Sequence, residues 1–330
     1  MNLIYMARPI YGGWVTFTAH LHLKYNCLLF KPSKRNETRL RDFGYGVSYQ
    51  NQTIQSIQEK ENLVITAIDK HYYEYLPFFP DNTILILHDP TELKGKDNPI
   101  INHLHRFQIR VIRKTMQDFL KQTYSIESEY YPHPFYEYSS KTNTGFTYPY
   151  VSISRIDFDK HTDLLLKANM KLPDSEPKIQ LFGAENRLYV HHKLKPLGFE
   201  DVWHGKYPKT LPLQKENTSI LKNAKYVLDM SIIKGDGGGT QYTFLEAIYE
   251  NCVLILHNDW VSQGNTFQDK VNCYVVGKPN SETHKPTDEE ISDEIVNILI
   301  NQDQNEYETI LKQSKQLLNT HTQVTWFENK

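Results

Sequence analysis

A glycine-rich segment in the second half of the chain has the composition of an anion-binding loop. Residues 235–240 read Gly-Asp-Gly-Gly-Gly-Thr and stand between an apolar run, 226–230, and a predicted amphipathic helix, 241–250. Consecutive glycines let a ligand approach the backbone because they carry no Cβ. The helix behind them directs free N–H groups and the positive end of its dipole toward an anion. We therefore expect this backbone to face a phosphate or a sugar, through Gly237, Gly238, Gly239 and Thr240.

One acid follows the loop at a position that suits a sugar. Glu246 lies about one turn inside the predicted helix. A carboxylate repels phosphate but accepts hydrogen bonds from a pair of hydroxyls, as the acid of dinucleotide-binding folds does with ribose. The alternative is a flexible loop followed by a solvated glutamate on a helix face.

Two cations stand five residues apart behind another predicted strand, 150–153. Arg155 and Lys160 would occupy a short strand-to-helix turn. Two cations so placed can hold a diphosphate and stabilise the charge of a leaving group. The alternative is a pair of ordinary surface charges.

The first half carries two further candidates. His88 and Asp89 directly follow a buried run, 83–87, and titratable residues at the tip of a parallel strand are candidates for site chemistry. Asp89 could instead cap a turn formed with Pro90 and Thr91. Gly12 and Gly13 lie between the first predicted strand and helix, as a ligand-facing loop or simply as a tight turn.

These residues are positioned by alternating strands and helices. Strands are predicted at 2–6, 27–30, 63–67, 83–87, 108–112, 150–153, 178–182, 226–230, 252–256 and 271–276, and helices at 16–25, 114–122, 162–169, 241–250, 287–301 and 305–318. Strand–loop–helix–strand units build parallel α/β sheets, and the pattern restarts in the second half. The polar segment 139–147 separates the halves, so we expect domains at 1–145 and 146–330.

Composition and charge narrow the class of protein. The 330 residues are 39% hydrophobic and 23% charged, with a net charge of −2, which is typical of a globular protein and argues against an obligate polyanion binder. The first 150 residues carry 17 Lys and Arg against 14 Asp and Glu, and five of these cations lie in 31–41. That half can therefore tolerate an anionic partner. Three cysteines without metal spacing indicate a reducing, cytoplasmic setting, and no apolar run reaches membrane-spanning length.

Taken together, these segments resemble the GT-B glycosyltransferases of the large retaining family 4 type. The likeness covers nearly the whole chain and rests on Met6–Thr16, on the Arg155–Lys160 spacing in 154–165, and on 235–252. It implies two Rossmann-like α/β domains facing across a cleft, with a UDP-sugar as donor and neither cofactor nor metal. The resemblance also implies that Arg155 and Lys160 bind the diphosphate and that Glu246 binds ribose.

One position departs from the family pattern. The family usually has a first glutamate eight residues before the second, and Gly238 stands there. Asp236 or Gln241 could take its place next to the transferred sugar.

A narrower likeness is to the DNA α-glucosyltransferases of T-even phages. It rests on Met6–Arg8, Gly13–Phe17, the His88–Asp89 pair and Tyr242–Glu246. This likeness implies DNA modification in the host cytoplasm, with a hydroxymethylated base of duplex DNA as acceptor and His88 and Asp89 meeting the sugar and the acceptor hydroxyl. Enzymes that act on a base must expose it from the stack, through contacts to the backbone. Two alternatives stay open: a glycosyltransferase acting on a saccharide or lipid-linked acceptor, and an inactive nucleotide-sugar-binding protein.

Overall fold

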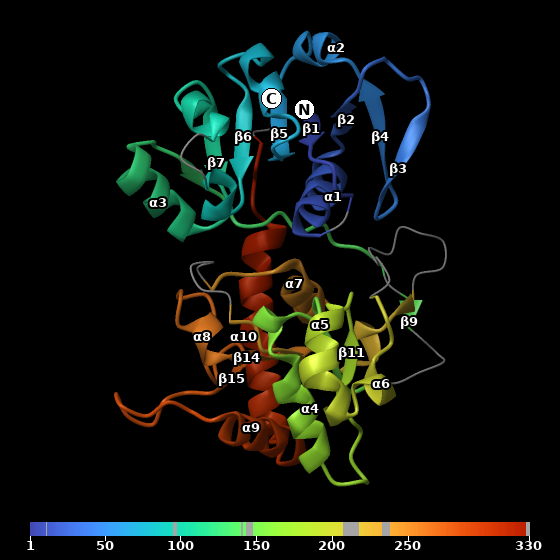
Figure 1. The fold of residues 1–330 in the computed structure, drawn as a ribbon, viewed down its shortest axis with the longest axis vertical. Helices are drawn as coiled ribbons and strands as arrows, with labels where there is room; N and C mark the ends of the chain where they lie inside the picture. The colour runs from blue at the N-terminus through green and yellow to red at the C-terminus, as the bar shows by residue number, and fades with distance from the viewer. Residues whose placement is uncertain are drawn as a thin grey trace. The chain divides into compact units, whose positions relative to one another are not determined.

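The chain folds into two compact units (Figure 1). The structure is a computed structural model that describes residues 1–10, 12–94, 98–139, 141–142, 148–206, 218–232 and 238–327. Unit 1 comprises Met1–Tyr138 with Thr320–Lys330, and unit 2 comprises Ser139–Asn319. The expected boundary after residue 145 falls within 143–147, which lie outside the described residues, and stays a prediction.

The chain end belongs to unit 1, whereas the sequence pattern assigned it to the second domain. Trp326 is 1% exposed, its ring lies 5.3 Å from that of Phe17, and its indole N–H donates to Pro132 O at 2.9 Å. The Tyr25 hydroxyl donates to Val324 O at 2.6 Å. Burial of a large aromatic ring with a satisfied N–H holds this segment in unit 1.

Unit 1 is built on an eight-stranded sheet of order β3-β4-β2-β1-β5-β6-β7-β8. Its strands are β1 (Asn2–Met6), β2 (Leu28–Pro32), β3 (Leu40–Gly44), β4 (Val47–Gln52), β5 (Leu63–Ile68), β6 (Ile84–Leu87), β7 (Gln108–Val111) and β8 (Glu129–Tyr130). Neighbouring strands are parallel except β3 and β4. Strands β2, β3 and β4 lie on one side of β1, and β5 to β8 lie on the other. The carboxyl ends of β1 and β5 therefore form the switch point, where such sheets bind ligands.

The central strands of unit 1 are mainly apolar. Every residue of β5 and β6 is buried, as expected for parallel strands covered on both faces. The helices of this unit are α1 (Gly13–Tyr25), α2 (Ile54–Gln58) and α3 (Lys114–Tyr124). Asn26 ends α1 in the left-handed conformation at φ 50°, which asparagine tolerates better than most residues.

Both ends of the basic segment 31–41 lie in strands. Its first two residues belong to β2, and its last two begin β3, which pairs antiparallel with β4. The turn between these strands contains Gly44, Tyr45 and Gly46, all at positive φ. The strand pattern was hidden by charged and exposed side chains, which are typical of an edge strand protected against further pairing.

Unit 2 contains a parallel five-stranded sheet of order β11-β10-β13-β14-β15. The strands are β10 (Tyr150–Ile153), β11 (Gln180–Phe182), β13 (Tyr226–Asp229), β14 (Val253–His257) and β15 (Tyr274–Val276), with a separate short pair of β9 (Lys141–Thr142) and β12 (Thr218–Ser219). Strand β11 lies on one side of β10, and β13 to β15 lie on the other. The switch point therefore lies at the carboxyl ends of β10 and β13.

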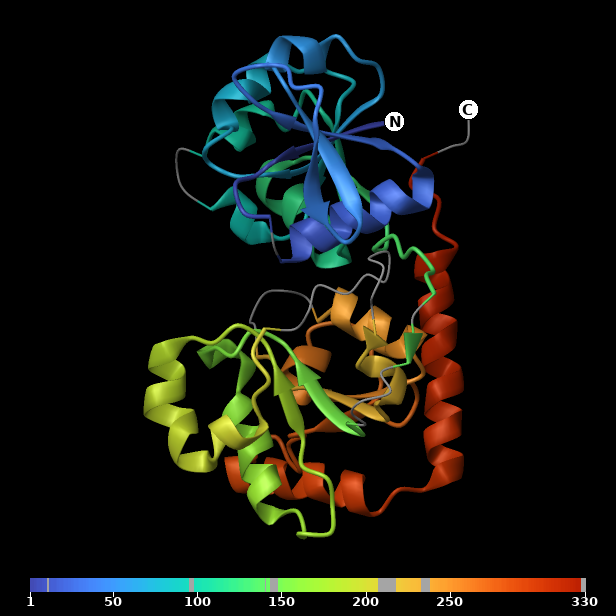
Figure 2. The same cartoon turned by 90° about the vertical axis from the view of Figure 1, so that its right-hand side faces the viewer.

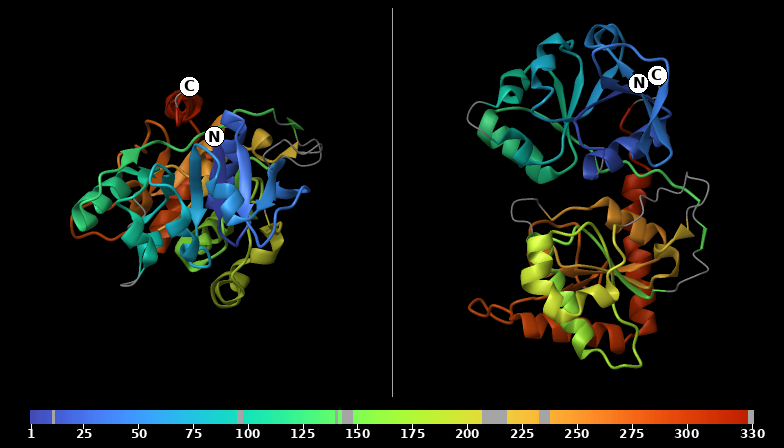
Figure 3. Two further views of the ribbon diagram at one scale, coloured as in Figure 1. Left: turned by 90° about the horizontal axis from the view of Figure 1, so that it is seen from above. Right: turned by 45° about the vertical axis from the view of Figure 1, so that its right-hand side comes forward.

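Helices cover the sheet of unit 2. They are α4 (Thr162–Lys171), α5 (Arg187–Tyr189), α6 (Phe199–Val202), α7 (Tyr242–Tyr249), α8 (Asn258–Val261), α9 (Asp288–Ile300) and α10 (Gln304–Thr322). Helices α4 and α9 pack side by side (Figure 3). The long α10 runs beside the sheet (Figure 2), where the Tyr307 hydroxyl reaches Lys225 O and Asn251 O at 3.2 and 3.1 Å.

The predicted element types are confirmed in both units. The capping box that opens α9 is present, since Thr287 and Glu290 exchange side-chain-to-backbone hydrogen bonds. The fold class, two parallel α/β units, is therefore confirmed. None of the helices within the described ranges is long and apolar enough to cross a membrane.

Candidate functional site

Lys160 lies at the switch point of unit 2. Its side chain is only 7% exposed, and Nζ donates a hydrogen bond to Ser231 Oγ at 2.6 Å. The carboxylate of Asp229, the last residue of β13, lies 3.8 Å from the same nitrogen. A buried ammonium is stable only where acceptors or opposite charges face it. The fold therefore holds a buried cation at the sheet edge where a ligand of unit 2 is expected.

Arg155 stands on the same turn but in a different environment. Its side chain is 59% exposed and bonds two acids, Asp157 at 2.8 Å and Asp159 at 2.9 Å. Burial opposes ionisation of Asp157, but hydrogen bonds from Phe158 N–H and other donors, together with the Arg155 charge, lower its pKa. Arg155 is thus a surface cation with carboxylate partners. An incoming diphosphate would have to share or replace those partners.

The glycine loop is described only from Gly238 onward; Asp236 and Gly237 lie outside the described residues. Gly238 has φ +60°, and a Cβ added there would lie 2.3 Å from the carbonyl oxygen of Trp260. A Cβ at Gly239 would meet nothing within 4 Å. In this backbone conformation, no side chain fits at residue 238, to which the resemblance to family 4 assigned a glutamate. That position therefore requires glycine, while Gly239 leaves open space next to the helix.

Helix α7 begins directly after this loop. Gln241 is its N-cap residue without a side-chain capping bond, and Thr240 before it is buried. Glu246 is 7% exposed, and burial, together with the nearby Glu250, raises the pKa of its carboxyl to about 8. Glu246 is therefore mostly uncharged at pH 7. A neutral or readily ionised carboxyl in a buried position suits hydrogen bonding to hydroxyls better than pairing with a phosphate.

His88 is buried at the end of β6 in unit 1. Its Nε2 lies 2.8 Å from the carbonyl oxygen of Thr66, and since a carbonyl only accepts, Nε2 carries the proton. Burial lowers the pKa of the ring to about 4. The ring is therefore neutral at pH 7, with Nδ1 as a hydrogen-bond acceptor. Phe17 packs edge-on against it, with ring centroids 4.8 Å apart.

Asp89 adopts the turn-capping geometry that was its alternative interpretation. Its Oδ1 accepts from the Thr91 N–H at 2.7 Å and caps the short helix Pro90–Leu93. The neighbouring Glu92, which the sequence did not single out, accepts from the His88 N–H at 3.0 Å and from Trp14 Nε1 at 2.8 Å. Burial raises the pKa of Glu92 well above its usual range. Glu92 thus connects the strand end that carries His88 to the start of α1.

The Gly12–Gly13 pair opens α1. Gly12 is the N-cap residue with φ +87°, a conformation that residues with a side chain avoid, and Gly13 is the first residue of the helix. At the adjoining switch point, Asp69 accepts from the Arg8 N–H at 2.7 Å and thereby ties the end of β1 to the end of β5. No sequence pattern singled out Asp69, because a lone acid after a strand is common.

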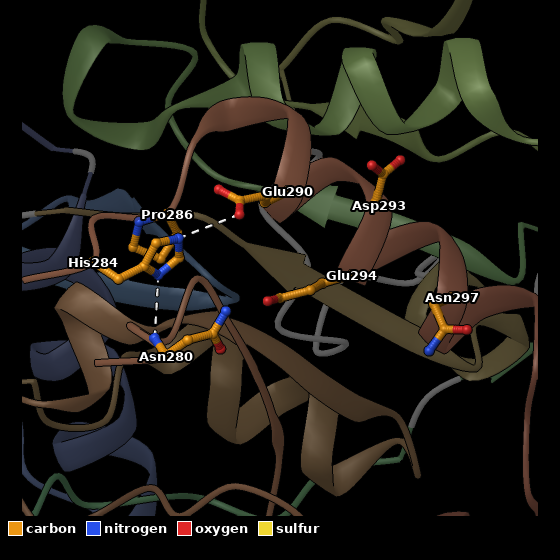
Figure 4. Close-up of a pocket in the computed structure, with 7 residues that line it drawn as sticks. All are labelled: Asn280, His284, Pro286, Glu290, Asp293, Glu294 and Asn297. Atoms are coloured by element: carbon orange, nitrogen blue, oxygen red, sulfur yellow. Dashed lines mark hydrogen bonds and ion pairs between the residues drawn. The ribbon is translucent and has the colours of Figure 1, made fainter.

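The described residues contain no group of three or more His, Cys, Asp or Glu side chains that could hold a metal ion. A polar hollow beside α9 gathers acids (Figure 4), but they have other roles. Glu290 caps α9 and bonds His284, Glu294 accepts from the Gly277 N–H at 2.7 Å, and Asp293 pairs with Lys171. This hollow holds none of the predicted site residues.

Comparisons with known proteins identify this fold. No family model and no curated protein sequence matches the chain. Among solved structures, HepE of Anabaena in complex with UDP and glucose matches with a TM-score of 0.68 at 14% identity, over 98% of this chain and 95% of that one. A glycosyltransferase of Rickettsia africae matches with a TM-score of 0.62 at 11% identity, over 97% and 94%.

A third structure was solved with nucleic acid. It is an α-glucosyltransferase in complex with UDP and a 13-mer DNA containing an HMU base, with a TM-score of 0.64 at 12% identity, over 97% of this chain and 95% of that one. At such identities the likeness establishes the fold, and it does so over nearly the full length of both chains. The chain accordingly has the GT-B fold that these glycosyltransferases share.

Proposed function

We propose that the chain is a retaining glycosyltransferase that moves a sugar from a UDP-sugar to the hydroxyl of 5-hydroxymethylcytosine in duplex DNA. The observation that carries the donor half of this proposal is the buried Lys160 at the switch point of unit 2. Breaking the bond between the sugar and UDP leaves negative charge on the diphosphate, and a cation fixed in a low-dielectric site stabilises that charge.

The remaining donor contacts follow from the same edge of the sheet. Arg155 adds a second cation from the turn after β10. Gly239 offers open backbone in front of α7, and the buried Glu246 would accept hydrogen bonds from ribose. Asp236 or Gln241 would contact the transferred sugar in place of the glutamate that Gly238 excludes. With the charge supplied by side chains, we propose that the reaction needs no metal or cofactor.

The acceptor half of the proposal rests on unit 1. Gly12 and Gly13 keep the start of α1 free of side chains, and neutral His88 offers Nδ1 to a hydroxyl. The segment 34–39 presents exposed cations next to the edge strand β3, and exposed cations of this kind contact phosphates of the DNA backbone. A DNA-bound structure among those of the same fold is in keeping with this acceptor.

The setting that we propose is a cytoplasm, that of the host cell if the chain is viral. All three cysteines are free and buried, as expected for a reducing compartment.

Transfer of radiolabelled sugar from a panel of UDP-sugars to duplex DNA tests the proposal. We expect label only in DNA that contains 5-hydroxymethylcytosine, and the panel identifies the sugar. Parallel duplexes with 5-hydroxymethyluracil or unmodified cytosine show which base is accepted. Sensitivity of the product to α-specific or β-specific glucosidases reports whether the anomeric configuration is retained.

Other outcomes select the alternatives. Hydrolysis of UDP-sugar without label in any DNA would overturn the DNA acceptor and favour a saccharide or lipid-linked one. Tight UDP binding with neither hydrolysis nor transfer would overturn the enzymatic proposal and leave a nucleotide-sugar-binding protein.

A further inference from the structure

Two residues at the end of β13, Asp229 and Ser231, hold the side chain of Lys160. The Ser231 hydroxyl oxygen accepts from Lys160 Nζ at 2.6 Å, while the same hydroxyl donates to Asp229 Oδ1. The Ser231 N–H also donates to this Oδ1, at 2.8 Å. Asp229 thus fixes both the backbone and the hydroxyl of Ser231, which leaves a lone pair of the hydroxyl directed at the ammonium.

The side chains of this Lys160 cluster are all buried. Lys160, Asp229 and Ser231 are 7%, 4% and 0% exposed. Asp229 Oδ2 accepts no hydrogen bond from the described residues and faces Lys160 at 3.8 Å. A buried carboxylate with an unused oxygen is costly unless a cation lies nearby. The Lys160 ammonium, which faces this carboxylate, explains why Asp229 can be buried here.

The backbone reinforces this arrangement. The N–H of Ile232, which follows Ser231, donates to the carbonyl of Asp159 at 2.9 Å. The exit of β13 is therefore joined to the residue before Lys160. The ammonium has three N–H donors, and the Ser231 bond occupies one of them, so donors remain for a ligand.

We infer that Ser231 and Asp229 are positioning residues that hold the Lys160 ammonium where the diphosphate of the donor binds. Ser231 bonds the lysine directly, and Asp229 orients Ser231 and balances the charge. This inference rests on the proposed function. A four-carbon side chain loses rotamer freedom when it binds a ligand, and a lysine already held in place has less to lose.

The test compares UDP with uridine, which has the same base and ribose but no diphosphate. We expect Ser231→Ala to weaken UDP binding about tenfold, the effect of one lost hydrogen bond, and to leave uridine binding unchanged. Calorimetry measures the UDP affinity, and ligand-observed NMR measures that of uridine. Ser231→Cys, with nearly the volume of serine, serves as the second variant if the cavity left by alanine impairs folding.

Two more variants complete the experiment. Asp229→Asn keeps an oxygen for Ser231 and is expected to weaken UDP binding less than Ser231→Ala. Asp163→Asn is the matched control, because Asp163 accepts from the Tyr189 hydroxyl at 2.5 Å in the same unit. It should leave UDP affinity unchanged.

Two results would overturn different claims. If the native chain binds UDP and Ser231→Ala binds it equally well, or loses UDP and uridine binding in parallel, the positioning role is wrong. If the native chain binds no UDP at all, the proposed function itself fails.

Discussion

The indole of Trp14 and the carboxyl of Glu92 are joined by a hydrogen bond of 2.8 Å across 78 residues of sequence. Trp14 is the second residue of α1, next to the glycine pair, and Glu92 also binds the N–H of His88. The bond therefore couples the two segments of unit 1 that the sequence selected as candidates for chemistry.

Replacing Trp14 tests this coupling. Trp14→Phe keeps an aromatic ring but removes the donor, so we expect transfer to the acceptor to fall about tenfold or more while donor hydrolysis changes little. Trp203→Phe is the control, since it removes the indole bond to Gly183 O at 3.0 Å in unit 2. Equal losses of transfer and hydrolysis in Trp14→Phe would contradict a role on the acceptor side.

Arg155 should matter for turnover and little for stability. Because its side chain is 59% exposed, its ion pairs with Asp157 and Asp159 contribute little to folding. We expect Arg155→Ala to lower kcat by about two orders of magnitude or more, with the melting temperature unchanged. Arg187→Ala, at a side chain that is 93% exposed, is the control. Unchanged kcat in Arg155→Ala would exclude Arg155 from the diphosphate site.

The two described glycines of the loop should respond differently to the same substitution. Gly238→Ala should destabilise the fold by at least about 2 kcal/mol, because φ is +60° and the new Cβ would collide with Trp260 O. Gly239→Ala should leave stability unchanged, since its Cβ enters open space, and should weaken UDP binding if that space holds the donor. Thermal melts and calorimetry on both variants measure these effects. Equal stability of the two variants would contradict the loop conformation.

Glu246→Gln should stabilise the free protein while weakening donor binding. Since burial raises the pKa of Glu246 from 4.5 to about 8, the unfolded chain releases this proton at lower pH than the folded chain. The stability associated with this group is complete below about pH 4.5 and is lost as the pH rises toward 8. We therefore expect the variant to unfold less readily than the native chain at pH 8, by up to about 4 kcal/mol.

Melting curves from pH 5 to 9 check the Glu246 prediction. The advantage of Glu246→Gln should grow with pH, and Glu200→Gln, at an exposed position of α6, should show no such trend. A variant that melts below the native chain at every pH would show that the carboxyl is stabilised by contacts that the amide lacks.

The sequence by itself determined the fold class and the strand ends that carry the candidate site. The mainly apolar runs 63–67 and 252–256 have to be buried on both faces, which requires parallel strands covered by helices. Polar residues directly after such runs must then lie at the carboxyl edge. This reasoning located Lys160 and His88 without any contact being known.

Only the tertiary structure decided which residues support them. Asp229 and Ser231 are 69 and 71 positions from Lys160, and Glu92 is 78 from Trp14, so no local pattern could join these partners. Asp229 did leave a signal, as a carboxylate within an otherwise apolar strand. The return of Trp326 to unit 1 left no comparable signal, because its burial depends on a surface built by residues some 300 positions away. Periodicity reports the local environment of each segment, whereas long-range partners follow from how the strands are ordered in the sheet.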